Sequence, residues 1–322
     1  MKRIEGLDWE GSFITELACV KGCLVYLNKD VSMPWLFGAT GYAFVLNMHE
    51  SVSPGCPNGW NKDQLALLGR NVGYTIQRVT FGGHRSPTGT SFEESVRRGQ
   101  EFVRDAIASK TPCFTWQGEQ KEYYVINGYD DSGFYISGPG TSDTSVPWSR
   151  LGDSESGWVE VFSLTSCEPT SDRQTVKDAL EFAIAISQNP NEWVLPDCKT
   201  GLEAYDVWTE SLETKKAFWF GNSFNAVAWA ECRRRAVGFL TEAKARLKDV
   251  PPETFDEAIG HYVIVSENMN KVAEAFPFGC ADPNPKHIED GARVAGAVSA
   301  LRDAQKAERD GLKALERIVE FL

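Results

Sequence analysis

The stretch Glu122-Tyr-Tyr-Val-Ile-Asn-Gly-Tyr-Asp-Asp-Ser-Gly-Phe-Tyr-Ile-Ser-Gly-Pro139 decides the fold of the first half of this chain. Two β-rich runs flank an Asp-Asp-Ser-Gly turn, which is the usual signal for a β-hairpin. Further strands are predicted around the hairpin, at 74–81, 111–116 and 158–164. The last of them alternates between apolar and polar residues and is expected to close a largely antiparallel sheet.

Helical periodicity accompanies these strands. Apolar residues recur at helical spacing in 14–28, and a short helix is predicted at 61–72. A longer helix is predicted at 91–109, where a Ser-x-x-Glu sequence fits a capping box. The apolar, glycine-punctuated segment 33–49 is expected to be buried and to run into a strand. A first helix followed by an antiparallel sheet predicts an α+β domain.

The second half of the chain has a different composition. A linker-like stretch at 166–172 is followed almost entirely by residues with a 3.6-residue period. The predicted helices are 172–188, 201–213, 222–248, 253–275 and 287–321. The charged residues from Arg302 to Arg317 are expected to form a solvated face or a partner surface. The chain is therefore predicted to have an α+β domain at 1–168 and an all-α domain at 169–322.

Charge and composition limit the partners. The 322 residues carry a formal net charge of −12, which argues against nucleic acid and anionic membranes because both would repel the protein. The N-terminus has no apolar signal-peptide core, and no stretch of about 18 apolar residues occurs, so a cytoplasmic location is expected. The eight cysteines are scattered and expected to be reduced thiols. Because no Cys-x-x-Cys or spaced histidine pair occurs, no metal and no cofactor are predicted.

Cys19 is the candidate nucleophile, because it falls in the first turns of the helix predicted at 14–28. A helix N-terminus and an adjacent imidazolium are the standard means of lowering the pKa of a thiol. The alternative is that Cys19 has a structural role as a small buried apolar residue, as free cysteines commonly do.

The order of these motifs resembles a known family. Cys19-Val-Lys-Gly-Cys-Leu24, Lys110-Thr-Pro-Cys113, the hairpin, Pro147-Trp148 and a final strand together resemble the C39-like branch of the papain-like cysteine hydrolases. More narrowly, the chain resembles the butirosin-biosynthesis BtrH N-terminal type, in which such a domain precedes a helical region. The segments 34–44 and 275–278 strengthen the match. The resemblance covers most of the chain.

The resemblance implies acyl transfer in which Cys19 attacks a carbonyl, but three expected partners are replaced. The oxyanion-hole glutamine falls at Phe13, the catalytic histidine at Glu122 and the orienting aspartate at Gly138. Loss of one such group typically costs about two to four orders of magnitude in rate. Conventional peptide cleavage is therefore not expected.

Glu122 and the histidines leave several alternatives open. A carboxylate is too weak a base for a thiol and would raise the pKa of the cysteine, so Glu122 could be a general acid or could simply face solvent. His49 is the best spare base, or else a strand-end histidine bonded to the backbone. His84 is expected on an exposed loop, His261 in helix packing, and His287 has no suggested partner.

Aromatic residues are dense in the first half of the chain. Apolar walls with a few polar groups suit a small organic ligand, although most of the rings are better explained as core. The residues predicted to bind such a ligand are Trp35, Tyr42, Asn47, Tyr124 and Asn127. A homo-oligomer formed through the helical domain is left open.

Two functions follow from these observations. The first is a cysteine-dependent acyltransferase or amidohydrolase that acts on a small acyl or amide substrate. The second is a non-catalytic relative that binds a small molecule or a partner protein in the same cleft. The retained Cys19 favours the enzyme, whereas the three replaced positions favour the binding protein.

Overall fold

The computed structural model describes residues 1–60, 63–82, 91–117, 121–155, 157–189, 194, 197–279 and 284–322. Contacts divide the chain into two compact units, each built from two stretches of sequence. Unit 1 comprises Met1–Val31 and Gly73–Pro169, and unit 2 comprises Ser32–Val72 and Thr170–Leu322. The segment 32–72, which the sequence assigns to the first domain, thus belongs with the C-terminal helices.

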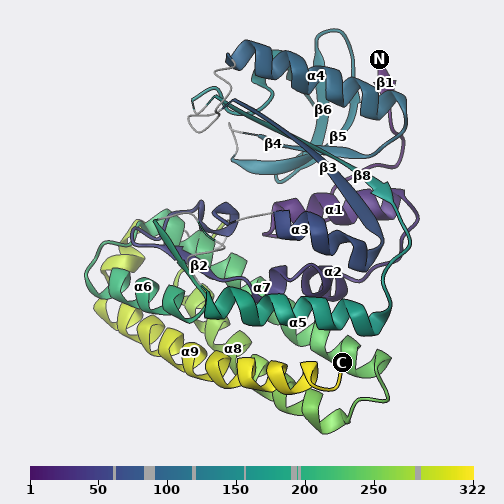
Figure 1. The fold of residues 1–322 in the computed structure, drawn as a ribbon. Helices are drawn as coiled ribbons and strands as arrows, with labels where there is room; N and C mark the ends of the chain where they lie inside the picture. The colour runs from purple at the N-terminus through teal and green to yellow at the C-terminus, as the bar shows by residue number, and fades with distance from the viewer. Residues whose placement is uncertain are drawn as a thin grey trace. The chain divides into compact units, whose positions relative to one another are not determined.

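Unit 1 is built on a seven-stranded antiparallel sheet (Figure 1). Six strands follow the order β3-β8-β4-β5-β6-β7, and β1 pairs with the end of β5. The strands are β1 (Lys2–Arg3), β3 (Tyr74–Gly82), β4 (Cys113–Gln117), β5 (Glu122–Tyr129), β6 (Gly133–Gly138), β7 (Thr141–Pro147) and β8 (Trp158–Ser166). Strand β8, which was expected to close the sheet, lies inside it between β3 and β4, and β7 was not predicted.

The predicted hairpin is confirmed as β5 and β6. Its turn is held by Asp130, whose carboxylate accepts hydrogen bonds from the Ser132 hydroxyl, the Ser132 and Gly133 amides and the Tyr135 hydroxyl. These bonds, led by those from Ser132 and Tyr135, favour the ionised form and hold the pKa of Asp130 well below its usual value. A β-bulge between Ile126 and Gly128 shifts the register of the pair.

Two helices cover the sheet, and Figure 1 shows α4 (Phe92–Ala108) and α1 (Thr15–Tyr26) on its opposite faces. The expected cap of α4 is present, since the Ser91 side chain accepts from the Glu94 amide at 3.2 Å. Helix α1 has nine of its twelve residues buried and is therefore enclosed on nearly every side rather than amphipathic.

Gly22 fixes how closely α1 lies against the chain that precedes it. A Cβ atom at this position would lie 1.9 Å from the carbonyl oxygen of Asp8, well inside the van der Waals distance. Only glycine allows the 8–9 backbone to approach the helix so closely.

Unit 2 contains the five predicted C-terminal helices, together with elements from 32–72. The helices are α5 (Asp172–Gln188), α6 (Leu202–Glu213), α7 (Trp219–Arg246), α8 (Pro252–Ala275) and α9 (Gly291–Val319). The earlier segment adds α2 (Met33–Ala39), α3 (Asp63–Leu68) and β2 (Asn47–His49), which pairs antiparallel with β9 (Cys198–Thr200). No helix in the described part of the chain combines the length and the apolar character needed to cross a membrane.

A buried ion pair in the C-terminal stretch of unit 2 is hydrogen-bonded to the earlier stretch. The Arg233 guanidinium of α7 donates to both carboxylate oxygens of Glu308 on α9, at 3.0 and 2.7 Å. It also donates to the backbone oxygens of Ala43 and Val45, at 3.0 and 2.8 Å, and the Tyr205 hydroxyl donates to Glu308. Glu308 therefore lies in the core, although the charged residues from Arg302 to Arg317 were expected to form a solvated face or a partner surface.

Candidate functional site

Helix α1 carries Cys19 into the interior of unit 1. The side chain is the fifth of the helix and is fully buried. Burial raises the pKa of the thiol well above its usual value, and the neighbouring Cys23, Glu16 and Glu122 raise it further. A thiol in this environment stays protonated and out of reach of solvent, which is the opposite of what a nucleophile needs.

Glu122 anchors the start of α1 to the sheet. The Thr15 hydroxyl donates to Glu122 Oε2 at 2.6 Å, and the Tyr123 amide donates to Thr15 Oγ1 at 3.1 Å. Helix α1 has no side-chain cap from Ile14, its N-cap residue, so this arrangement ties its first residue to β5. Glu122 is half-buried and does not simply face solvent.

Tyr124 occupies the space beside Gly138, the position at which the resemblance implies an aspartate. A Cβ atom on Gly138 would lie 2.3 Å from Tyr124 Cδ1. The Tyr124 hydroxyl donates to the Pro139 oxygen at 3.3 Å, which keeps the ring in place. A carboxylate at 138 would therefore require the Tyr124 ring to move, so the two residues are sterically coupled.

The remaining residues expected in unit 1 have structural contacts. The Asn127 amide donates to Ser137 Oγ at 3.2 Å across the hairpin, while its Oδ1 atom has no hydrogen-bond partner among the described residues. Phe13, the position at which the resemblance implies an oxyanion-hole glutamine, is 44 % exposed and has no side-chain donor for an oxyanion. Among the described residues, unit 1 contains no histidine, and His84 lies outside the described residues.

The other predicted site residues belong to unit 2. His49 ends β2, where its Nδ1 atom accepts from the Ser51 amide at 3.1 Å and contacts the Ser51 hydroxyl at 2.8 Å. This is the strand-end histidine bonded to the backbone that the sequence left open as an alternative. The structure thus brings Cys19 and Glu122 together within unit 1 and places the candidate base in unit 2.

Trp35, Tyr42 and Asn47 are core residues of unit 2. The Trp35 ring lies 5.2 Å from that of Phe239, and the Tyr42 hydroxyl donates to the Pro57 oxygen at 2.7 Å. Asn47 is fully buried, and in the part of the chain that the structure describes neither of its side-chain polar atoms has a hydrogen-bond partner. That these three residues bind a ligand stays a prediction.

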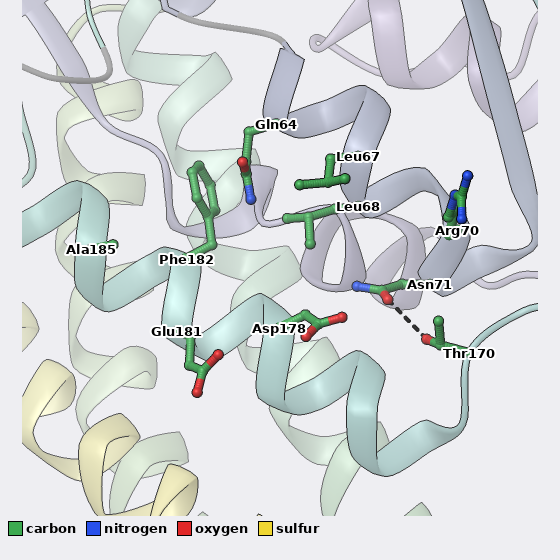
Figure 2. A pocket seen from close by; sticks show the side chains of 10 residues that line it. All are labelled: Gln64, Leu67, Leu68, Arg70, Asn71, Thr170, Asp178, Glu181, Phe182 and Ala185. Atoms are coloured by element: carbon green, nitrogen blue, oxygen red, sulfur yellow. Dashed lines mark hydrogen bonds between the residues drawn. The ribbon is translucent and has the colours of Figure 1, made fainter.

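A cavity of about 460 Å³ opens between α5 and the chain around α3, entirely within unit 2 (Figure 2). Its size lies in the range of small-molecule sites. Asn71 lines it and is fixed by two bonds, donating to the Ala39 oxygen at 3.0 Å and accepting from the Thr170 hydroxyl at 2.8 Å. Sequence reasoning missed this cavity because its two walls are about a hundred residues apart in the chain.

Comparison with known proteins adds no family. No family model matches the chain, and no curated protein matches it either.

The buried thiols make stability sensitive to alkali. Burial raises the pKa of Cys113 to about 12 from a usual value near 9, so between these pH values the folded state keeps a proton that the unfolded state loses. The stabilisation is complete below about pH 9 and is lost as the pH rises towards 12. We expect Cys113→Ala to reduce the slope of unfolding free energy against pH, measured by urea denaturation from pH 9 to 11, by at most about 1.4 kcal/mol per pH unit.

Val125→Ala is the matched control for this measurement, because Val125 is a fully buried neighbour in β5 with no titratable group. It should lower stability while leaving the slope unchanged. An unchanged slope in Cys113→Ala would contradict the expected titration of the thiol.

Proposed function

We propose that this protein is a non-catalytic binding protein for a small molecule, derived from a papain-like scaffold of the C39 and BtrH type. The observation that carries the proposal is the full burial of Cys19, with a thiol pKa raised by that burial and by nearby acidic groups. A cysteine acyltransferase or amidohydrolase needs the reverse, namely an accessible thiolate beside a base.

The positions that depart from the family pattern have structural roles. Glu122 binds the Thr15 hydroxyl, and the Tyr124 ring fills the space that a side chain at 138 would need. Such contacts support the view that the inherited site has become part of the protein core. The ligand site of the proposed function is the cavity of unit 2, which has the size and the mixture of apolar and polar walls that a small molecule requires.

Alkylation by iodoacetamide tests the proposal. We expect Cys19 in the native protein to react at least about 1,000-fold more slowly than a free thiol at pH 8, because it becomes accessible only when the protein opens. Peptide mass spectrometry would follow each cysteine, with Cys167, which is half-buried, as the internal comparison and the protein in guanidinium as the fully reactive control.

The enzyme alternative makes the opposite prediction. Alkylation of Cys19 faster than that of a free thiol would restore the acyltransferase or amidohydrolase. Native mass spectrometry of the purified protein supplies a second test, because a co-purified small molecule should be retained equally by the wild type and by Cys19→Ala. If the wild type retained the ligand and Cys19→Ala lost it, the ligand would bind at the thiol, and the cavity of unit 2 would be rejected as its site.

A further inference from the structure

The cavity of unit 2 presents charges of opposite sign on its two walls. Arg70 lies on one wall, in the turn η3 (Gly69–Val72), and Asp178 and Glu181 lie on the other wall, on α5. Figure 2 shows Arg70 across the view from Glu181, with Asp178 between them. Across the described residues, neither the Arg70 guanidinium nor the Glu181 carboxylate makes a hydrogen bond or an ion pair, whereas Asp178 accepts from the Gln174 amide at 2.6 Å.

The wall that carries these charges is held in place. The Arg70 carbonyl accepts from the Thr170 amide at 3.2 Å, and Thr170 is bonded to Asn71 in turn. On α5, the Phe182 ring is almost fully buried and lies 6.1 Å from the Trp60 ring, which holds the wall beside Glu181 in place. Such a site needs little reorganisation to bind a ligand.

Apolar surface lies between the charged ends. Phe182, Leu67 and Leu68 line the cavity, and the Leu67 side chain is 63 % exposed although it borders a concave surface. A ligand that covers Leu67 would remove apolar area from water, which contributes favourably to binding.

We propose that the cavity binds a small zwitterion in which a protonated amine and a carboxylate are separated by an apolar body. The amine binds the carboxylates of Asp178 and Glu181, the carboxylate binds Arg70, and the apolar body covers the exposed Leu67 side chain. This inference rests on the proposed function and names the chemical class of its ligand.

The dipeptide phenylalanyl-leucine is the probe, because it carries one charge at each end of an apolar body. Saturation-transfer NMR with the full chain is expected to detect binding, and titration should give an affinity about 3- to 10-fold higher than for the N-acetylated or the C-terminally amidated dipeptide. The effect is modest because both Arg70 and Glu181 are exposed to solvent, which screens the interactions.

Variants assign each end of the probe to its residue. Glu181→Gln combined with Asp178→Asn should abolish the preference for the free amine over the acetylated form while keeping the preference for the free carboxylate, and Arg70→Gln should do the reverse. Glu267→Gln and Arg309→Gln replace exposed residues of unit 2 outside the cavity lining, and they should retain both preferences.

The outcomes separate this inference from the proposed function. Equal binding of the capped and uncapped dipeptides, or binding of none of them at about 10 mM, overturns the zwitterion. A co-purified ligand of unit 2 that lacks the amine or the carboxylate also overturns the zwitterion, but it leaves the proposed binding function intact. Hydrolysis of the dipeptide, visible in the same spectra and lost in Cys19→Ala, instead overturns the proposed non-catalytic function.

Discussion

Replacing Glu308 with alanine is expected to lower the free energy of unfolding by about 3–5 kcal/mol. The substitution leaves the Arg233 guanidinium fully buried, with only the backbone oxygens of Ala43 and Val45 as acceptors and no opposite charge. An uncompensated buried charge is among the costliest defects in a protein interior. Guanidinium denaturation followed by far-UV circular dichroism would measure the loss, because unit 2 contains most of the helices.

Glu316→Ala is the matched control, since Glu316 lies on the same helix but is exposed. Its effect should stay within about 0.5 kcal/mol. The double variant Arg233→Met with Glu308→Leu removes both charges and should recover most of the lost stability, because apolar replacements for buried ion pairs are often neutral or better. A loss below about 1 kcal/mol in Glu308→Ala would show that the ion pair does not hold unit 2 together.

Gly22→Ala is expected to destabilise unit 1 by about 2 kcal/mol or more, even though alanine is the better helix former. The added methyl group would lie 1.9 Å from the Asp8 carbonyl oxygen, so either α1 or the chain at 8–9 must move. Both atoms in this contact belong to the backbone or are attached directly to it, and a rotamer change cannot relieve the overlap. Thermal unfolding followed by circular dichroism would report the lower midpoint.

Gly260→Ala provides a control that is expected to change stability in the opposite direction. Gly260 also lies within a helix, α8, but a Cβ atom there would have no neighbour within 4 Å. Alanine should therefore raise stability by about 0.5–1 kcal/mol through its helix propensity alone. If both substitutions stabilised the protein, the close approach at Gly22 would be refuted.

The sequence predicted those elements whose signals are local. The hairpin, the cap at Ser91 and the C-terminal helices were found because turn residues, capping residues and helical periodicity lie within one element. Helix α2 was missed because seven apolar residues show little periodicity, although Ser32 as N-cap followed by Pro34 was an available start signal. Strand β7 was missed because its residues Thr141–Pro147 are mostly polar and exposed.

Features that depend on distant pairings could not be predicted in the same way. Nothing near residue 308 in the sequence distinguishes Glu308 from the charged residues around it, and its burial follows only from its pairing with Arg233. The resemblance implied that Cys19 and Glu122 are neighbours, and the chemistry of a carboxylate beside a thiol predicted that the pKa of the thiol would rise. The contact between Tyr124 and Gly138 was not visible, because it depends on the register of the hairpin.

The interleaving of the two units along the chain has a consequence for biosynthesis. The first stretch of unit 2 begins at Ser32, and residues 73–169 of unit 1 separate it from the second stretch. The buried Arg233 of the second stretch can pair with Glu308 only after residue 308 has been synthesised. At about 5–20 residues per second, a ribosome needs tens of seconds to pass from the first part of unit 2 to the last. During that interval the apolar segment from Trp35 to Phe44 has no helical bundle to cover it, so the nascent chain should depend on chaperones that shield hydrophobic segments.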